Sequence, residues 1–182
     1  MAHGKSQRLR FKRRRNGKTD YRRRLRMLRG GAPRAIVRVS NTQVQCQLAE
    51  FDPEGDRIIA SVSGSNLAAY GWPAGASTKS VPACYVAGYA LGKSALSAGH
   101  DSAILDIGLA ASSPGNRIFA ALKGMVDSGL DVPHGEGVLP SDDRVNGAHI
   151  DDSLAAAVEA AKNAIDCLLY TSDAADDTPC VD

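Results

Sequence analysis

The stretch Ala103-Ile104-Leu105-Asp106-Ile107-Gly108-Leu109 is almost continuously apolar, with one acidic residue at its centre. A strand with one face in water alternates apolar and polar residues, whereas a run of this kind is typical of a central strand covered on both faces. Helical patterns precede and follow it. A strand enclosed between two helices predicts a domain of the α/β class, in which helices pack on a sheet.

The segments that flank this run predict one helix each. The first extends from about Pro82 to Ala98 and ends at Gly99, which suits the C′ position of a helix. Its many alanine and glycine residues would let it lie close to a sheet. The second opens at Ser113-Pro114, an N-cap followed by proline at the first helical position, and ends at Gly129.

Alternation of apolar and polar residues dominates the segments upstream of these helices. Residues 35–40, 44–48 and 58–62 each alternate with the period of two that a strand requires. Asn41-Thr42 marks a tight turn between the first two segments, and Asp52 to Asp56 marks a second turn. These signals predict an antiparallel meander. The whole order is then β-β-β-α-β-α, and the sheet is mixed.

The remaining body residues give weaker signals. Residues 130–150 are expected to form a loop, and residues 151–166 are expected to form a C-terminal helix. Residues 167–182 show no clear periodicity and are expected to be a disordered tail. Trp72, the only tryptophan, lies in a long connection, where it is expected to cover an edge of the core rather than to stack on a base.

The N-terminal part of the chain is strongly basic. Residues 1–38 contain fifteen of the 22 Lys and Arg residues and one acidic residue, Asp20. The formal net charge of +2 therefore hides a chain divided into a basic arm and an acidic body. Each cation that neutralises a phosphate releases a counterion, and arginine can bind phosphate through two parallel hydrogen bonds. The arm thus favours a polyanionic partner over the alternatives, a solvated tail or a targeting signal.

Local structure in this arm is expected to be limited. The residues before Thr19 have no apolar periodicity and are expected to stay disordered until a partner binds. With Thr19 as N-cap, a short helix is expected to run to about Arg29, with Tyr21, Leu25 and Leu28 on one face. Such a helix is too short and too self-repelling to be stable alone, so it should order only against RNA or against the body.

Composition excludes several classes of function. No run approaches the roughly 20 apolar residues of a membrane span, and the N-terminus lacks the apolar stretch of a signal peptide. The four cysteines are scattered without a Cys-x-x-Cys pair, so they are expected to be reduced thiols rather than disulfides or zinc ligands. Neither a cofactor nor a small-molecule substrate is expected, because no nucleotide-binding fingerprint or Ser/His/Asp arrangement is present.

Four segments resemble the archaeal and eukaryotic type of large-subunit ribosomal protein family eighteen, with more likeness to the archaeal branch. They are Arg13 to Arg22, Arg38 to Asn41, Gly88 to Lys93, and Leu105 to Leu109, the last continuing towards Ile150. The resemblance covers roughly residues 8–165 in order. It implies an α/β fold of ribonuclease-H-like topology, which agrees with the order of elements predicted above.

The resemblance also implies a function. Proteins of this family bind 5S ribosomal RNA (5S rRNA), attach it to the large subunit in the central protuberance, and touch the large-subunit rRNA and neighbouring ribosomal proteins. A non-catalytic protein of the cytoplasmic ribosome is therefore expected, without a membrane partner. The alternative within the same broad class is another RNA-binding protein with an Arg-rich arm.

Matching positions to the family assigns the residues expected to touch ribosomal RNA. In the arm they are Lys12, Arg13, Arg14, Arg15, Lys18, Tyr21, Arg22, Arg23, Arg24 and Arg26, and at the end of the first strand they are Arg38, Ser40 and Asn41. Tyr21 can stack on a base or pack on the body, and both options stay open. Ser40 and Asn41 also suit ordinary turn chemistry, although the resemblance favours RNA contact.

An alternative from a different class is a magnesium-dependent nuclease of the ribonuclease H type. Asp106, Asp142 and Asp143 are the carboxylates that would have to converge on a metal ion. The first predicted strand, residues 34–40, contains no acidic residue, although such nucleases usually place a ligand there. We therefore predict no catalytic residue and no metal site.

These signals divide the chain into four parts. Residues 1–33 form the basic arm, 34–150 the α/β domain, 151–166 a C-terminal helix that is cut short, and 167–182 the tail. The tail departs from the family, because Cys167 to about Asp177 resembles the translation of a sequencing adapter. It is expected to be non-native and to have no evolved role.

Overall fold

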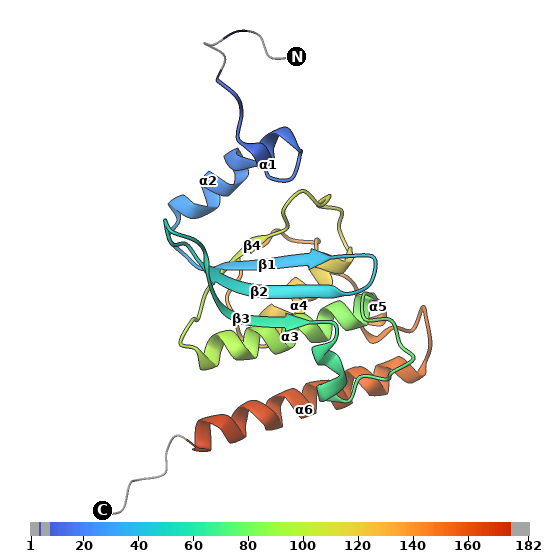
Figure 1. Ribbon diagram of the computed structural model, residues 1–182. Helices are drawn as coiled ribbons and strands as arrows, with labels where there is room; N and C mark the ends of the chain where they lie inside the picture. Colours follow the sequence, from blue (N-terminus) through green and yellow to red (C-terminus); the bar gives the residue numbers. More distant parts are fainter. Residues whose placement is uncertain (1–3, 5–7, 176–182) are drawn as a thin grey trace, which may run out of the picture.

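The computed structural model describes residue 4 and residues 8–175, and it confirms a mixed α/β fold. Strands β1 (Arg34–Val39), β2 (Val44–Glu50) and β3 (Arg57–Ser63) form the predicted meander, and β4 (Ile104–Asp106) joins them later in the chain. The strand order is β3-β2-β1-β4, with antiparallel β1–β2 and β2–β3 pairs and a parallel β1–β4 pair. Figure 1 shows this sheet face on.

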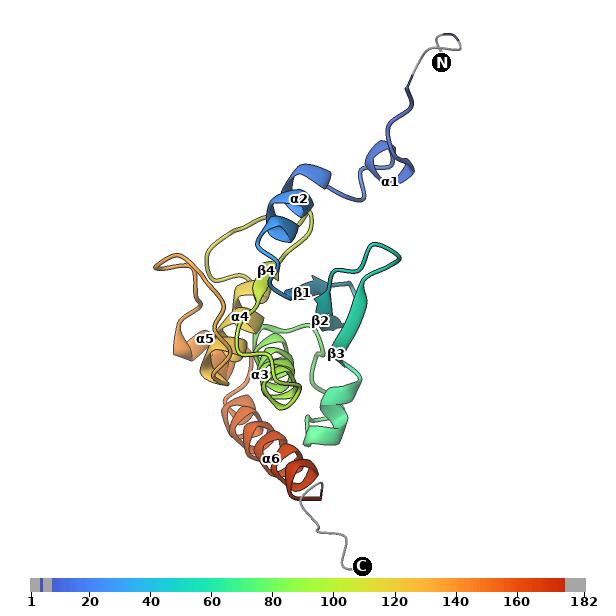
Figure 2. The ribbon, with the colours of Figure 1, turned by 90° about the vertical axis from the view of Figure 1, so that its left-hand side faces the viewer.

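Helices pack on one face of the sheet. Helix α3 (Val81–Ser97) lies against β2 and β3, and α4 (Arg117–Asp127) and α6 (Ser153–Ala175) pack on α3. Shorter elements connect them, namely the 3-10 helix η1 (Asn66–Tyr70) and helix α5 (Asp142–Asn146). Two N-terminal helices, α1 (Lys12–Arg15) and α2 (Tyr21–Arg29), lie at the opposite side of the molecule from α6 (Figures 1 and 2).

Helix α3 forms the centre of the core, and its predicted end at Gly99 is confirmed by a left-handed φ of 80° there. A Cβ atom added at Gly88 would lie 2.0 Å from the Ala121 carbonyl oxygen, and one at Gly124 would lie 2.1 Å from the Tyr85 carbonyl oxygen. The backbones of α3 and α4 therefore touch. The small residues of α3 serve this contact between helices, and not only the contact with the sheet that was predicted.

The apolar run of residues 103–109 was predicted to form a central strand of the sheet, and this prediction is wrong. Among the described residues, β4 pairs with β1 alone and forms one edge of the sheet. The start of β4 is bordered by a later segment, since the Ala103 amide donates to the Asp131 carbonyl at 2.9 Å. Leu105 and Ile107 line an apolar hollow that α2, α4 and the loop before α5 complete. An edge strand covered in this way needs the same apolar composition as a central one.

Two helix boundaries also differ from the predictions. Helix α4 is capped by Asn116, whose side-chain oxygen accepts hydrogen bonds from the Ile118 and Phe119 amides, both at 2.9 Å. Ser113-Pro114 lies in the preceding loop, because one side chain at Asn116 satisfies two free amides of the first turn. The expected loop over residues 130–150 contains the short helix α5, which was not predicted.

The C-terminal helix is longer than expected. Helix α6 continues beyond residue 166 to Ala175, and residues 176–182 lie outside the described part of the chain. Residues 167–175 contain neither glycine nor proline, so no residue there would stop a helix. The non-native origin of this segment stays a prediction. Before it, Ile165 is fully buried, and the Tyr89 hydroxyl donates to the Asp166 carboxylate at 3.0 Å.

Two further sequence predictions can be compared with the fold. Trp72 is 5% exposed and belongs to the core. This confirms the prediction that Trp72 packs on the core and does not stack on a base. Cys46 and Cys84 are buried free thiols. In the described ranges, no helix combines the length and the apolar composition that crossing a membrane would need.

Candidate nucleic-acid interface

The basic arm is ordered around its single acidic residue. The Asp20 side chain caps α2 by accepting from the Arg22 amide at 2.9 Å and from the Arg23 amide at 3.2 Å. These bonds hold the pKa of Asp20 below its ordinary value. The predicted cap, Thr19, instead accepts a hydrogen bond from Arg13 Nε at 2.8 Å and so connects α1 to the start of α2. Asp20 is the better cap because its carboxylate also favours the positive end of the helix dipole.

Helix α2 buries only part of its predicted apolar face. Tyr21, Arg24, Met27 and Leu28 are partly buried, whereas Leu25 is 53% exposed. Leu25 was expected to share one face with Tyr21 and Leu28, but Arg24 is partly buried in its place. The rotation of the helix is therefore set by an ion pair and not by a continuous row of apolar residues.

That ion pair belongs to a chain of alternating charges beneath α2. Arg24 Nη2 lies 2.8 Å from Asp56 Oδ2, and Arg34 Nη2 lies 2.6 Å from the same oxygen. Arg34 also contacts Asp106 at 3.2 Å, and Asp106 in turn contacts Arg38 at 2.9 Å. Arg34 is 1% exposed and Asp106 is 5% exposed. A buried arginine is thus neutralised by two carboxylates, as burial of a charge requires.

The two carboxylates remain charged in this environment. Burial raises the pKa of Asp106, but the charges of Arg38 and Arg34 and hydrogen bonds from Arg38 and the Gly108 amide lower it further, so the net pKa lies below the ordinary value. The pKa of Asp56 is lowered in the same way, since hydrogen bonds from Arg24 and Arg34 outweigh its burial. Both groups therefore act as fixed negative charges under the arm.

The loop after β4 fastens the arm at a second point. Arg23 Nη1 donates to the Gly108 carbonyl at 2.8 Å. Gly108 has a φ of 63°, and a Cβ atom there would lie 2.9 Å from Arg38 Cζ. The left-handed φ favours glycine at this position, and a side chain there would also displace the Arg38 guanidinium. Three of the arginines expected to bind RNA therefore donate hydrogen bonds to residues of the α/β domain instead. They are Arg23, Arg24 and Arg38.

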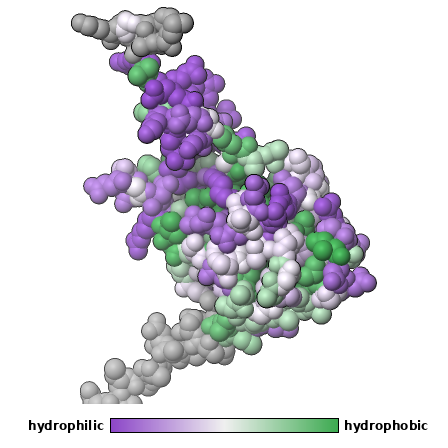
Figure 3. All heavy atoms as spheres, turned by 45° about the vertical axis from the view of Figure 1, so that its right-hand side comes forward, coloured by the Kyte–Doolittle hydropathy of each residue, from purple (hydrophilic) through white to green (hydrophobic). Residues whose placement is uncertain are grey.

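The other described arm cations make no side-chain bond to the body. In the described part of the chain, Arg24 is the only arm cation that pairs with an acidic residue. Figure 3 shows these hydrophilic side chains gathered over α1 and α2. Arg22, Arg26 and Arg29 are exposed and spaced at i, i+4 and i+7, on the side of α2 away from the body. The unpaired cations, which in the described arm bond neither to an acidic residue nor to the body, are Arg8, Arg10, Lys12, Arg13, Arg14, Arg15, Lys18, Arg22, Arg26 and Arg29.

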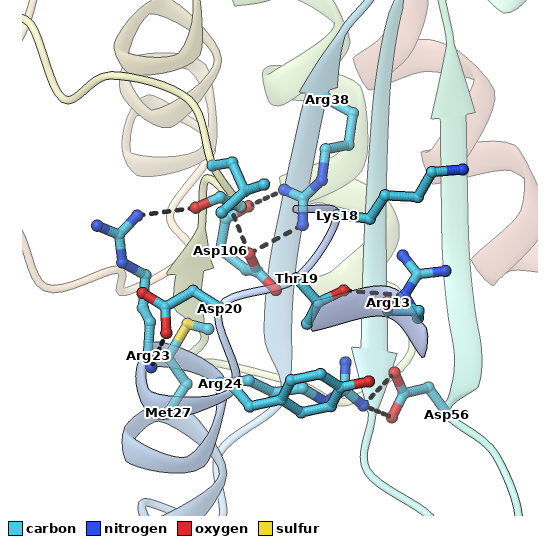
Figure 4. Close-up of a pocket in the computed structure, with 13 residues that line it drawn as sticks. Arg13, Lys18, Thr19, Asp20, Arg23, Arg24, Met27, Arg38, Asp56 and Asp106 are labelled. Carbon is cyan, nitrogen blue, oxygen red and sulfur yellow. Dashed lines mark hydrogen bonds and ion pairs between the residues drawn. The ribbon is translucent and has the colours of Figure 1, made fainter. Parts of the chain in front are cut away.

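A cleft of about 690 Å³ lies between the arm and the sheet (Figure 4). Its cationic lining consists of Arg13, Lys18, Arg23, Arg24 and Arg38. Three acidic side chains and Tyr21 complete the polar and aromatic lining. The structure therefore brings together five of the ten predicted arm residues, and Arg38, around one concave surface.

Ser40 and Asn41 do not reach that cleft. They follow the end of β1 after Arg38, and neither lines the cleft. Ser40 Oγ accepts from the Thr42 and Gln43 amides at 3.2 and 3.0 Å, so it serves the turn. Asn41 is exposed, and its carbonyl accepts from Lys79. RNA contact stays a prediction for both residues, as it does for the arm.

The carboxylates considered for a nuclease do not converge. Asp106 is engaged by two arginines, while Asp142 pairs with Lys123 on α4. Within the ranges that the structure describes, no group of three or more His, Cys, Asp or Glu residues could hold a metal ion. The sequence did not reveal that Asp56 holds the arm, or that Asp106 shares the buried Arg34 with it. The available signal was the presence of Arg34 and Asp106 within otherwise apolar strands.

An α/β domain that holds a helical arm in place, with a row of unpaired cations on its outside, defines the class of polyanion-binding proteins. Comparison with known proteins gives the family. Residues 5–102 and 97–135 match the family model described as ribosomal large subunit proteins 60S L5 and 50S L18. The chain belongs to this family, and it is a constituent of the large ribosomal subunit.

Individual relatives agree with this assignment. The large ribosomal subunit protein uL18 of Methanobrevibacter smithii is 48% identical over 150 residues, which cover 82% of this chain and 77% of the relative. That of Methanoculleus marisnigri is 50% identical over 140 residues, covering 77% and 79%. That of Haloferax volcanii is 45% identical over 150 residues, covering 82% and 80%. The predicted likeness to the archaeal branch is confirmed.

Proposed function

We propose that this protein binds 5S rRNA and attaches it to the large subunit in the central protuberance, where it also contacts the large-subunit rRNA and neighbouring ribosomal proteins. Its place is then the cytoplasmic ribosome, and its role is structural rather than catalytic. The observation that carries the proposal is the arm, whose outward cations are unpaired while its inward arginines are fixed to the body.

This division suits RNA binding for an energetic reason. A disordered arm loses conformational entropy when it binds, whereas a docked arm has already lost part of it. The ion pair of Arg24 with Asp56 and the bond from Arg23 to Gly108 hold α2 at a defined angle. The outer cations can then meet phosphates in a fixed register, and phosphate contacts are what position a protein on nucleic acid.

The nuclease alternative finds no support in the geometry. A metal-dependent nuclease needs carboxylates free to bind the ion. Asp106 instead balances the buried charge of Arg34 and bonds to Arg38. Its carboxylate thus has a structural role in the charge network beneath the arm.

Filter binding to 5S rRNA of Methanobrevibacter smithii tests the proposal. We expect the protein to prefer this RNA to a transfer RNA and to leave it intact with Mg²⁺ present. If about 6–10 phosphates are contacted, the affinity should fall by roughly 10³–10⁵ between 50 and 200 mM salt. A flat salt response, equal affinity for both RNAs, or cleavage would each overturn the proposal.

A pair of matched variants locates the binding surface. Replacing Arg14, Arg15 and Arg22 with glutamine removes three exposed arm charges and leaves the docking contacts of Arg23 and Arg24 in place. The control replaces three exposed body arginines with glutamine, namely Arg57, Arg117 and Arg144. We expect the arm variant to reduce the slope of log affinity against log salt by about 3 and the control to leave it nearly unchanged.

A further inference from the structure

We infer that the cleft between the arm and the sheet takes one unpaired nucleotide of the bound RNA, turned out of its helix. Its phosphate would lie near Arg13 and Lys18 and its base against Tyr21. The inference rests on the proposed binding of RNA and adds a specific pocket to it. Figure 4 shows Arg13 and Lys18 on the same side of this cleft, opposite Arg23.

The size of the cleft favours a single nucleotide. Its volume of about 690 Å³ lies within the range of roughly 300–1,000 Å³ in which proteins hold small organic ligands. A duplex is too wide to enter such a space and could touch only the rim. Sequence-specific proteins typically recognise RNA in loops and bulges, where unstacked bases can be splayed into a protein surface.

The charges of the cleft favour a phosphate on one side. Five cationic and three acidic side chains line it, which leaves a formal excess of two positive charges. The acids are already used, because Asp20 caps α2 and the other two pair with arginines. Arg13 bonds only to the neutral Thr19 hydroxyl, and Lys18 makes no ion pair with the described acids. An incoming phosphate therefore meets unneutralised charge at Arg13 and Lys18.

The aromatic lining favours a base. Tyr21 borders the cleft and is half-buried, and its ring lies 5.1 Å from the ring of Phe11 at an interplanar angle of 43°. This contact limits the rotation of both rings and gives the cleft a fixed aromatic wall. Bases stack on such rings without regard to their identity. Tyr21 can therefore pack on Phe11 of the arm and still present part of its ring to a base.

The cleft is also preformed on the side of the body. Its floor contains Arg38 and Asp106, which are bonded to each other, and Asp106 also pairs with the buried Arg34. The position of α2 above it is held by Arg24 on Asp56 and by Arg23 on Gly108. A preformed pocket loses little entropy when a ligand enters, which favours binding of a single extruded nucleotide.

The test uses the full chain and a set of Methanobrevibacter smithii 5S rRNAs. Each RNA carries the fluorescent base 2-aminopurine at one unpaired position, and the set covers every unpaired position. We expect binding to change the fluorescence of at least one RNA, for the wild type and for Tyr21→Phe. Tyr21→Ala should abolish that change and weaken binding about 5- to 150-fold, the range for loss of one stacked base.

Charge variants supply a matched control. Arg13→Ala with Lys18→Ala removes the two cations assigned to the phosphate, and Lys12→Ala with Arg14→Ala removes the same charge from outside the cleft. Both pairs should weaken binding, but only the first should diminish the fluorescence change. The emission of the buried Trp72 reports whether each variant is folded.

The outcomes separate this inference from the proposed function. If the wild type binds 5S rRNA and no unpaired position responds, or if Tyr21→Ala responds like the wild type, the nucleotide pocket is refuted and RNA binding stands. Equal responses of the two charge variants would likewise refute the placement of the phosphate. If the wild type does not bind the RNA at all, the proposed function fails first.

Discussion

Replacing Asp106 with asparagine tests whether the arm and the core share one charge network. The carboxylate is 5% exposed and lies 3.2 Å from Arg34, which is itself 1% exposed. Removing one partner of a buried pair typically costs about 3–5 kcal/mol, because the other charge stays buried and uncompensated. Arg34 keeps Asp56 at 2.6 Å, so we expect the lower end, about 3 kcal/mol. The amide oxygen of asparagine can still accept the Gly108 amide.

A thermal melt followed by Trp72 emission measures this effect. For a chain of this length, 1 kcal/mol corresponds to about 2–4 °C, so the Asp106→Asn melting temperature should fall by about 6–12 °C. Asp142→Asn is the control, since that carboxylate is 84% exposed and pairs with Lys123, and its melting temperature should not change. Adding Arg34→Met to Asp106→Asn should restore part of the loss, because the buried cation that has lost one of its two carboxylates is then absent.

Acid should reduce the difference between Asp106→Asn and the wild type. The folded protein holds the pKa of Asp106 below its ordinary value of 3.8. The stability contributed by this group is therefore fully present above pH 4 and is lost as the pH falls through the folded pKa. An Asp106→Asn protein that melts with the wild type at pH 7 would refute the charge network. It would also reopen the nuclease alternative, in which this aspartate serves a metal rather than Arg34.

Further predictions concern the core, the arm, the C-terminus and the thiols. Gly88→Ala should destabilise the fold by roughly 1–3 kcal/mol or more in a urea titration, because its Cβ would meet the Ala121 carbonyl oxygen at 2.0 Å. Gly75→Ala is the control and should be neutral, because no atom lies within 4 Å of the added Cβ. Arg24→Gln should speed amide hydrogen exchange across α2 relative to Arg26→Gln, and equal rates would contradict docking through Asp56. Deleting residues 169–182 should change the melting temperature little, since Ile165 and Asp166, which fasten α6, precede the cut. Burial raises the pKa of Cys84 to about 12, so Cys46 and Cys84 should react with a thiol reagent only at the rate of unfolding.

The meander and the α3 helix followed from the sequence because their signals are local. Alternation with a period of two and the turn at Asn41-Thr42 require only neighbouring residues, and both appear in the structure. The position of β4 could not be predicted in this way. A run such as Leu105 to Ile107 reports that side chains are covered, and it does not report whether a strand or a helix covers them.

The candidate interface shows a similar limit. The sequence identified the arm as basic, but it could not show which arginines point outward. Arg24 and Arg26 have the same chemistry, yet Arg24 is fixed by Asp56, a residue 32 positions later in the chain. The cap at Asp20 was misassigned for a local reason, since Thr19 and Asp20 are both good caps and their order is decided by the contact of Thr19 with Arg13.

One acid of the arm and one of the body also explain how a helix of this charge can be ordered without RNA. Helix α2 carries five arginines in nine residues, which is too short and too self-repelling for an isolated helix. Asp20 and Asp56 supply the missing negative charge, at its N-terminus and against Arg24. Docking uses two of the five arginines and fixes the rotation of the helix. The remaining three then necessarily form one outward row, one helical turn of about 5.4 Å apart, because residues at i, i+4 and i+7 share a face. The body thereby converts an excess of charge in the sequence into an oriented array of cations.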